Sequence, residues 1–184
     1  MGVLASFKAA RRQADVSNTL YLACVNQARV PAFFTEFGVP DTVDGRFDLI
    51  ILHTMLLIRR LRRQGKEAAN LSQATLNLMF ADMDRNLREM GVGDLSVGKQ
   101  VKKMAKAFYG RAEVWEEAMD MDVDTLRNAL VETVFRAVSE PGDGPDNLAA
   151  YVTAADSALR DLPDEQVAAG NLEFPSPQLE NTTA

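Results

Sequence analysis

The most apolar stretch of the chain lies between Phe47 and Arg63, where residues 49–52 and 55–58 are all apolar. A helix with this sequence has apolar side chains on nearly every side, so other elements have to cover it. A bilayer-spanning helix needs about 20 apolar residues, and this run is shorter and is interrupted by a histidine and a threonine. The pattern therefore predicts a buried helix at the centre of the fold.

Apolar positions recur at helical spacing on both sides of this central helix, and there is little of the β-branched alternation that is typical of strands. The expected further helices cover residues 17–31 with Ser17 as N-cap, 31–38, 66–90, 96–118, 123–138 and 145–162. The sequence therefore predicts an all-α protein, with about six to seven helices packed around the central apolar helix.

The chain has 184 residues, of which 47% are hydrophobic, and this is enough for the core of one domain. We expect residues 17–169 to form that helical domain and residues 1–16 to be a flexible or peripheral segment. Residues 170–184 have little apolar surface to bury, so we expect a disordered tail. The first residues lack the apolar core of a secretory signal, which favours a cytoplasmic location.

Charge is divided unevenly along the chain. Residues 1–112 contain 17 Lys and Arg against 10 Asp and Glu, whereas residues 113–184 contain 3 against 16. The formal net charge of −6 argues against DNA or general nucleic-acid binding. The basic part of the chain can still meet phosphates or anionic lipid head groups.

Two groups of cations stand out in the basic part. One is at the end of the central helix, and the other lies on a single face of the 96–118 helix, where no acid occurs between Leu95 and Ala112. A solvated face is the simpler interpretation, but we also consider both groups as contact surfaces for a partner. The residues are Arg59, Arg60, Arg62 and Arg63 in the first group and Lys99, Lys102, Lys103 and Lys106 in the second.

Three phenylalanines, Phe33, Phe34 and Phe37, fall within five residues of the expected second helix. Aromatic side chains this close together need cover, and packing in the core is the first interpretation. The alternative is an exposed aromatic patch that contacts an apolar helix of a partner.

The segment Gly93–Lys99 matches the first seven positions of the phosphate-binding loop G-x-x-x-x-G-K-[ST]. The next residue is Gln100, which lacks the hydroxyl that holds Mg²⁺, and a helix precedes the segment where a strand is required. We therefore expect a glycine-capped turn between two helices rather than a nucleotide site.

His53 is the only histidine, and no Asp or Glu lies three or four residues away to complete a metal-binding pair. A core histidine hydrogen-bonded to a buried carbonyl or carboxylate is the main interpretation. A small helical carrier that binds haem through His53 is the alternative function. Cys24, the only cysteine, has apolar neighbours and is expected to be a small buried side chain. We find no catalytic set, no metal site and no cofactor motif, so we expect a protein that is not an enzyme.

The central part of the chain resembles the ubiquinol–cytochrome c chaperone family, in the short alphaproteobacterial form without the long organelle-targeted extension of mitochondrial members. The resemblance covers about Pro31 to Gly110, and Leu148 to Leu159 weakly resembles the last helix of the family. The residues that carry it are Phe47, Leu49, Leu52 and His53, then Arg59, Arg60 and Gly65, then Phe80, Asp82, Met90-Gly91-Val92, Lys102-Lys103 and Phe108-Tyr109.

The resemblance implies a non-enzymatic assembly chaperone for the ubiquinol–cytochrome c reductase (bc1) complex. Its partner would be nascent cytochrome b, held before haem insertion, and the chaperone would be cytoplasmic or peripheral on the cytoplasmic face of the inner membrane. The lysine and arginine groups are then the candidate contacts for the client, the ribosome or an anionic membrane surface. The phenylalanine cluster is the alternative contact.

Overall fold

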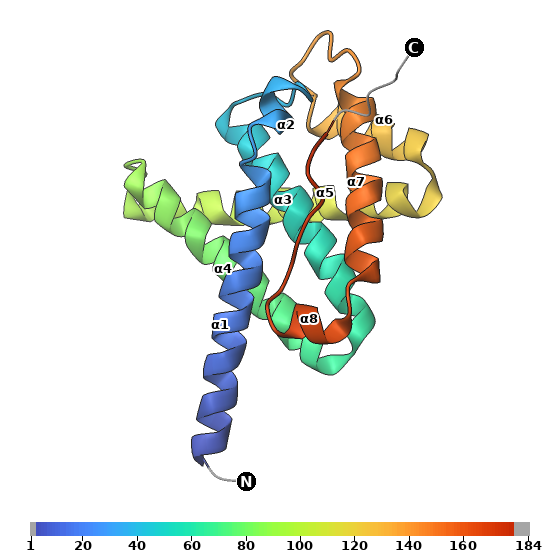
Figure 1. The fold of residues 1–184 in the computed structure, drawn as a ribbon. Coiled ribbons are helices and arrows are strands. Elements are labelled where there is room, and N and C mark those ends of the chain that lie inside the picture. Colours follow the sequence, from blue (N-terminus) through green and yellow to red (C-terminus); the bar gives the residue numbers. More distant parts are fainter. Residues whose placement is uncertain (1–2, 179–184) are drawn as a thin grey trace.

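A computed structural model describes residues 3–178 of the chain, with the side chains of residues 7–65 and 68–178 (Figure 1). Within residues 3–178 the structure contains only helices and connecting segments, so the all-α prediction is confirmed. The helices are α1 (Val3–Ala28), α2 (Ala32–Thr35), α3 (Val43–Leu61), a 3₁₀ turn (Arg62–Gln64), α4 (Lys66–Glu89), α5 (Asp94–Met121), α6 (Val123–Thr133), α7 (Gly144–Asp161) and α8 (Asp164–Ala168). Two of these, α2 and α8, are single turns of four and five residues.

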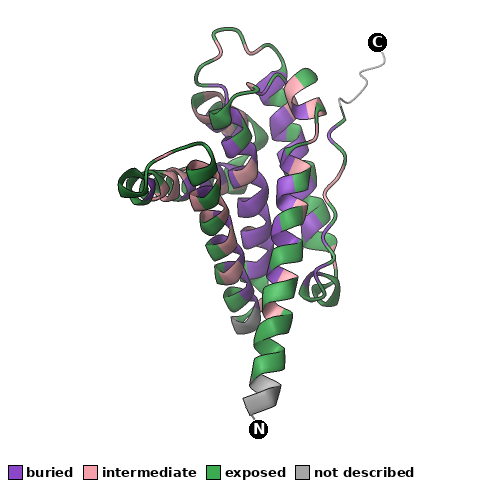
Figure 2. Cartoon of the chain, turned by 90° about the vertical axis from the view of Figure 1, so that its left-hand side faces the viewer, coloured by how far each residue is buried: buried purple, intermediate pink, exposed green. Residues whose placement is uncertain are grey.

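Helix α3 is the buried helix that the sequence predicts. Every side chain from Ile51 to Ile58 is buried, and α1, α4 and α7 pack around the helix (Figure 2). Its first turn is capped by Thr42, whose hydroxyl accepts a hydrogen bond of 3.1 Å from the backbone N–H of Gly45. The core of the domain is therefore built around one helix rather than between two layers.

The outer ends of α4 and α5 project from the body of the domain as a two-helix arm (Figure 1). Its turn is closed by Gly91, which has a φ of +84° that favours glycine. The N–H of Gly91 donates to the carbonyl of Arg88 at 2.9 Å, and the N–H of Val92 donates to that of Leu87 at 3.0 Å. These two bonds form the Schellman arrangement that the Gly91 C-cap predicts.

Helix α1 begins well before Ser17, so the N-cap prediction is wrong. Ser17 is buried inside the helix, and its hydroxyl donates to the carbonyl of Ala14 at 3.0 Å. The apolar stripe starts only near Val16, but residues 8–14 are mostly good helix formers and extend the helix into solvent. Residues 7–15 are mostly exposed, and this end of α1 reaches away from the body (Figure 1).

The chain after α8 lies in extended form along the domain, between α1 and α7 (Figure 1). We refer to residues 171–178 as the C-terminal strap. Leu172 and Pro177 are buried, and Phe174 packs against the core. The expectation of a disordered tail is therefore wrong for this part, because a few apolar side chains and prolines suffice to hold it against the domain. Residues 179–184 of the predicted tail lie outside the described residues.

Candidate interaction surfaces

Lys99, Lys102, Lys103 and Lys106 are all exposed on one side of α5. The opposite side of the same helix carries Val97, Phe108 and Ala112, which are buried. Phe108 meets Phe80 of α4 edge-on, with ring centroids 6.0 Å apart. Helix α5 therefore turns its lysines away from α4 and from the core, and we call this surface the lysine face.

The arginines at the end of α3 differ from the lysines in their contacts, because three of the four arginines form ion pairs within the domain. Arg59 pairs with Asp120 of α5 and with Asp156 of α7, the latter at 3.1 Å. Arg62 pairs with Glu116 at 2.6 Å. The pairing lowers the pKa of Asp120 below its ordinary value.

Arg60 is the most buried of these arginines. Its guanidinium donates to the carbonyl of Leu159 at 2.6 Å, to that of Leu162 at 2.6 Å, and to the carboxylate of Asp164 at 2.7 Å. It thereby joins α3 to the end of α7 and the start of α8. Of the four arginines only Arg63 is exposed without such an ion pair among the described residues, so this group does not form a basic surface beside the lysine face.

The phenylalanine cluster is mainly part of the core. Phe33 and Phe37 are buried and meet edge-on, with ring centroids 5.6 Å apart. Phe34 is half-buried, and the guanidinium of Arg46 lies 5.9 Å from its ring centroid. Core packing therefore accounts for Phe33 and Phe37, and neither side chain is available to a partner on this surface.

His53 has a hydrogen-bond partner at each ring nitrogen. Its Nδ1 lies 2.7 Å from the carbonyl oxygen of Leu49, which can only accept, so Nδ1 carries the proton. Its Nε2 lies 2.8 Å from the hydroxyl of Tyr151 and accepts from it. The Tyr151 hydroxyl in turn accepts from the side-chain amide of Gln27 at 3.0 Å. The main interpretation, a core histidine bonded to a buried carbonyl, is confirmed.

Aromatic rings and the strap enclose His53. Phe33 and Phe174 meet its ring edge-on, at centroid distances of 5.4 Å and 5.0 Å. Burial lowers the pKa of His53 to about 4 and raises the pKa of Tyr151. A haem iron needs a ring nitrogen with a free lone pair, and Tyr151 occupies that of Nε2. The geometry therefore gives no support to the haem-carrier alternative.

Two other sequence expectations can be compared with the structure. Cys24 is buried, its thiol donates to the carbonyl of His53 at 3.5 Å, and burial raises the pKa of the thiol, as expected for an inert core cysteine. In the Gly93–Lys99 segment, α5 already begins at Asp94. Most of this segment is helical and forms no loop around a phosphate, which agrees with the expected turn between helices.

One buried ionic site was not predicted. Asp48 is fully buried in α3 and lies 2.9 Å from Arg111 of α5 and 2.6 Å from Arg136, which follows α6. Burial raises the pKa of Asp48, while the two arginines oppose that shift. The sequence offered one sign of this site, which is an acid within the most apolar helix. Its two partners could not be predicted, because they are 63 and 88 residues away in the chain.

Two further classes of structural feature are absent from residues 3–178. None of the helices described there is long and apolar enough to cross a bilayer. Among those same residues, no three His, Cys, Asp or Glu side chains are grouped so that they can hold a metal ion.

Fold and surface together define a class of protein: a small, all-helical domain whose buried ionic groups join its helices and whose exposed lysines gather on one helix. The profile of the ubiquinol-cytochrome C chaperone family matches residues 35–174. The chain therefore belongs to the ubiquinol-cytochrome C chaperone family, as the resemblance of its central helices indicates.

Relatives of known name agree with this assignment. The chain is 26% identical over 133 residues to ubiquinol-cytochrome c reductase complex assembly factor 1 of Mus musculus, which covers 72% of the chain and 45% of that protein. The protein of the same name from Drosophila melanogaster is 24% identical over 155 residues, covering 82% of the chain and 60% of the relative. The chain thus spans about half the length of these relatives.

A solved structure extends the likeness to the whole domain. The Cbp3 homolog from Brucella abortus is 30% identical and superimposes with a TM-score of 0.86, covering 96% of this chain and 98% of that one. The arrangement of the helices is therefore that of an experimentally determined family member.

Proposed function

We propose that this chain is an assembly chaperone for ubiquinol–cytochrome c reductase and that its client is newly made cytochrome b. The observation that carries the proposal is the family match over residues 35–174, because it includes the central helix and the helices that surround it. The family is named after the whole complex, and the proposal specifies one subunit of that complex as the client.

The buried polar groups support a binding role rather than a catalytic one. His53 has both ring nitrogens engaged, and Asp48 lies between two arginines. A general acid or base has to reach a substrate, whereas these groups contact only other parts of the domain. Their geometry joins helices, so we propose that the protein acts by holding its client and not by chemical reaction.

Cytochrome b is an integral membrane protein, so a chaperone for it has to work at the membrane surface. We propose that this chain is peripheral on the cytoplasmic face of the inner membrane. The lysine face is our candidate for contact with the client, the ribosome or that membrane. Arg59, Arg60 and Arg62 are left out of it because their guanidinium groups are engaged by acids of α5, α7 and α8.

The test is affinity purification of the tagged chain from detergent-solubilised membranes of its own host, with and without ongoing translation. We expect cytochrome b to be enriched during translation and to be lost within minutes after synthesis is stopped. Another polytopic membrane protein of similar abundance serves as the control and should not be enriched. If cytochrome b is absent and a deletion strain keeps its bc1 activity, the proposal is wrong.

A further inference from the structure

The lysine face also carries apolar side chains that the domain leaves exposed. Leu95 is fully exposed, and at about 100° per residue it falls between Lys102 and Lys106 on the helix surface. Tyr109 is 55% exposed at the edge of the same face. Met90, in the turn at the tip of the arm, is 60% exposed. Leu95 and Met90 are outside the core, and Tyr109 packs on Phe108 and Phe80 with only part of its ring.

The charge around these side chains is of one sign. Residues 96–112 contain no acid, and among the described side chains none of the four lysines takes part in an ion pair. The nearest acid of the helix, Asp94, pairs with Arg88 on α4. The first unneutralised acid on this side is Glu113, about two turns beyond Lys106.

The position of the face suits an extended, flat partner. The arm projects from the body, and its buried side chains point toward the contact between α4 and α5. The lysine face is therefore presented outward, with Leu95 and Met90 at the end farthest from the core. A flat surface that meets this side of α5 can contact the four lysines, Leu95 and Tyr109 together.

We propose that the lysine face docks on an anionic phospholipid bilayer. In this arrangement the four ammonium groups lie at the lipid head groups, while Leu95 and Met90 enter the boundary between head groups and acyl chains. The ring of Tyr109 then lies at the interface with its hydroxyl in water, which is a favoured position for tyrosine at membranes. The proposal deepens the proposed function, on which the place of the chain at the membrane rests, by naming the surface and the lipid class, and it needs no client.

The composition of the face favours lipid over RNA. All four cations are lysines, whereas proteins that recognise nucleic-acid phosphates rely strongly on arginine, whose guanidinium binds two oxygens at once. The only arginine of α5, Arg111, turns inward to Asp48. Exposed aliphatic side chains beside the lysines also fit acyl chains, and they have no role in binding a phosphate backbone.

The experiment is co-sedimentation of the full chain with vesicles of phosphatidylcholine alone and of phosphatidylcholine with about one third phosphatidylglycerol. We expect binding to the anionic vesicles only, and we expect it to weaken as NaCl is raised from 0.1 M to 0.5 M, about a twofold change in Debye length. Replacing the four lysines together by glutamine should weaken partitioning by at least about tenfold, given the free energy that each lysine contributes near such a surface.

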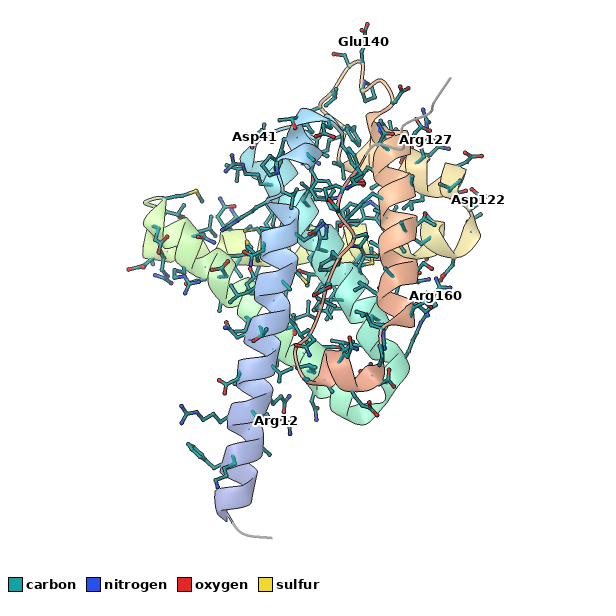
Figure 3. The ribbon with its side chains drawn as sticks, viewed as in Figure 1. Arg12, Asp41, Asp122, Arg127, Glu140 and Arg160 are labelled. Atoms are coloured by element: carbon teal, nitrogen blue, oxygen red, sulfur yellow. The ribbon has the colours of Figure 1, made fainter. Side chains whose placement is uncertain are left out.

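Matched variants separate this face from other exposed groups. Lys8→Gln, Arg11→Gln and Arg12→Gln together remove three charges from the projecting half of α1, where Figure 3 labels Arg12, and should leave binding within about twofold. Leu95→Ser should reduce partitioning by about fivefold. Met121→Ser alters another exposed apolar side chain of α5, away from the lysines, and should have little effect.

Equal binding to neutral vesicles, or unchanged binding of the four-glutamine variant, would overturn the proposal. The proposal would also be overturned if the four-glutamine variant kept its vesicle binding but lost binding to purified ribosomes, because the lysine face would then be an RNA-binding surface. Vesicle binding requires no cytochrome b, so a negative result leaves the chaperone proposal standing, and the reverse also holds.

Discussion

At the scale of single residues, the buried polar groups form hydrogen bonds with residues that are far away in the sequence. The sequence indicates that His53 is buried, because it stands among apolar residues of the central helix. Its partner at Nδ1 is four residues away, within the same helix, and is expected for a helical histidine. Its partner at Nε2, Tyr151, is 98 residues away. Local pattern therefore predicts the burial of His53 but not the network that satisfies it.

The lowered pKa of His53 gives a prediction about stability and pH. In the unfolded chain its pKa returns to about 6.5, whereas burial holds the pKa at about 4 in the fold. The unfolded state thus binds an extra proton between these values, so the stability that His53 provides is complete above about pH 6.5 and is lost as the pH falls toward 4. We expect about 2 kcal/mol less stability at pH 5 than at pH 7 from this residue.

Urea unfolding at the two pH values, for the wild type and for His53→Gln, tests this expectation. The variant should be less stable at pH 7 but should lose much less of its stability on going to pH 5. An equal loss in both proteins would mean that other groups cause the acid sensitivity. Titration of the His53 ring protons by NMR gives the pKa directly if the variant does not fold.

At the scale of elements, apolar periodicity located every long helix, but it extended α6 to residue 138, whereas the helix ends at Thr133. It placed the end of α4 well, where a glycine marks it. The α4–α5 turn at Gly91 is an example, because the left-handed conformation there is available mainly to glycine. The start of α1 was misplaced because residues 8–14 form a helix without burying any face. Helix α8 was missed because a single turn has no period to detect.

Arg60 illustrates how a charge joins elements, and its replacement should be costly. Arg60→Ala leaves the carbonyls of Leu159 and Leu162 without their donor inside the fold, so we expect a loss of about 3 kcal/mol. Arg46→Ala is the matched control, because Arg46 is exposed, its ion pair with Asp41 is exposed and its other contact is with the half-buried Phe34 ring, so it should cost much less. Chemical denaturation measures both. Similar losses for the two variants would refute the distinction.

At the scale of the whole molecule, the division of charge along the sequence is partly neutralised inside the fold. Arginines from the basic part of the chain pair with acids from the acidic part, at Arg59 with Asp156 and at Arg62 with Glu116. Arg160, labelled in Figure 3, belongs to the same group through Asp156. The sequence predicted the division but not these pairs, so it did not show which of the arginines are held by acids of the domain. The four lysines of the lysine face form no ion pair among the described side chains, so this surface keeps its positive charge.

The two ends of the chain should differ in what they contribute to stability. Residues 7–12 are exposed, so removing residues 1–12 should change the free energy of unfolding by less than about 0.5 kcal/mol. Removing residues 170–184 takes away buried Leu172 and the ring of Phe174, and it should cost about 2 kcal/mol or more. Urea unfolding of the two truncated chains decides this. Equal effects would mean that the strap is only loosely held.

The strap also bears on the order in which the domain can be completed. Gln27 of α1 donates to the carbonyl of Pro175 at 2.9 Å, a contact that spans 148 residues. This contact cannot form before the chain between these two residues has folded back on itself. Until then the ring of His53 lacks Phe174, and long-range contacts of this kind form slowly. The covering of the His53 ring by the strap is therefore expected to be one of the slower steps in the folding of this domain.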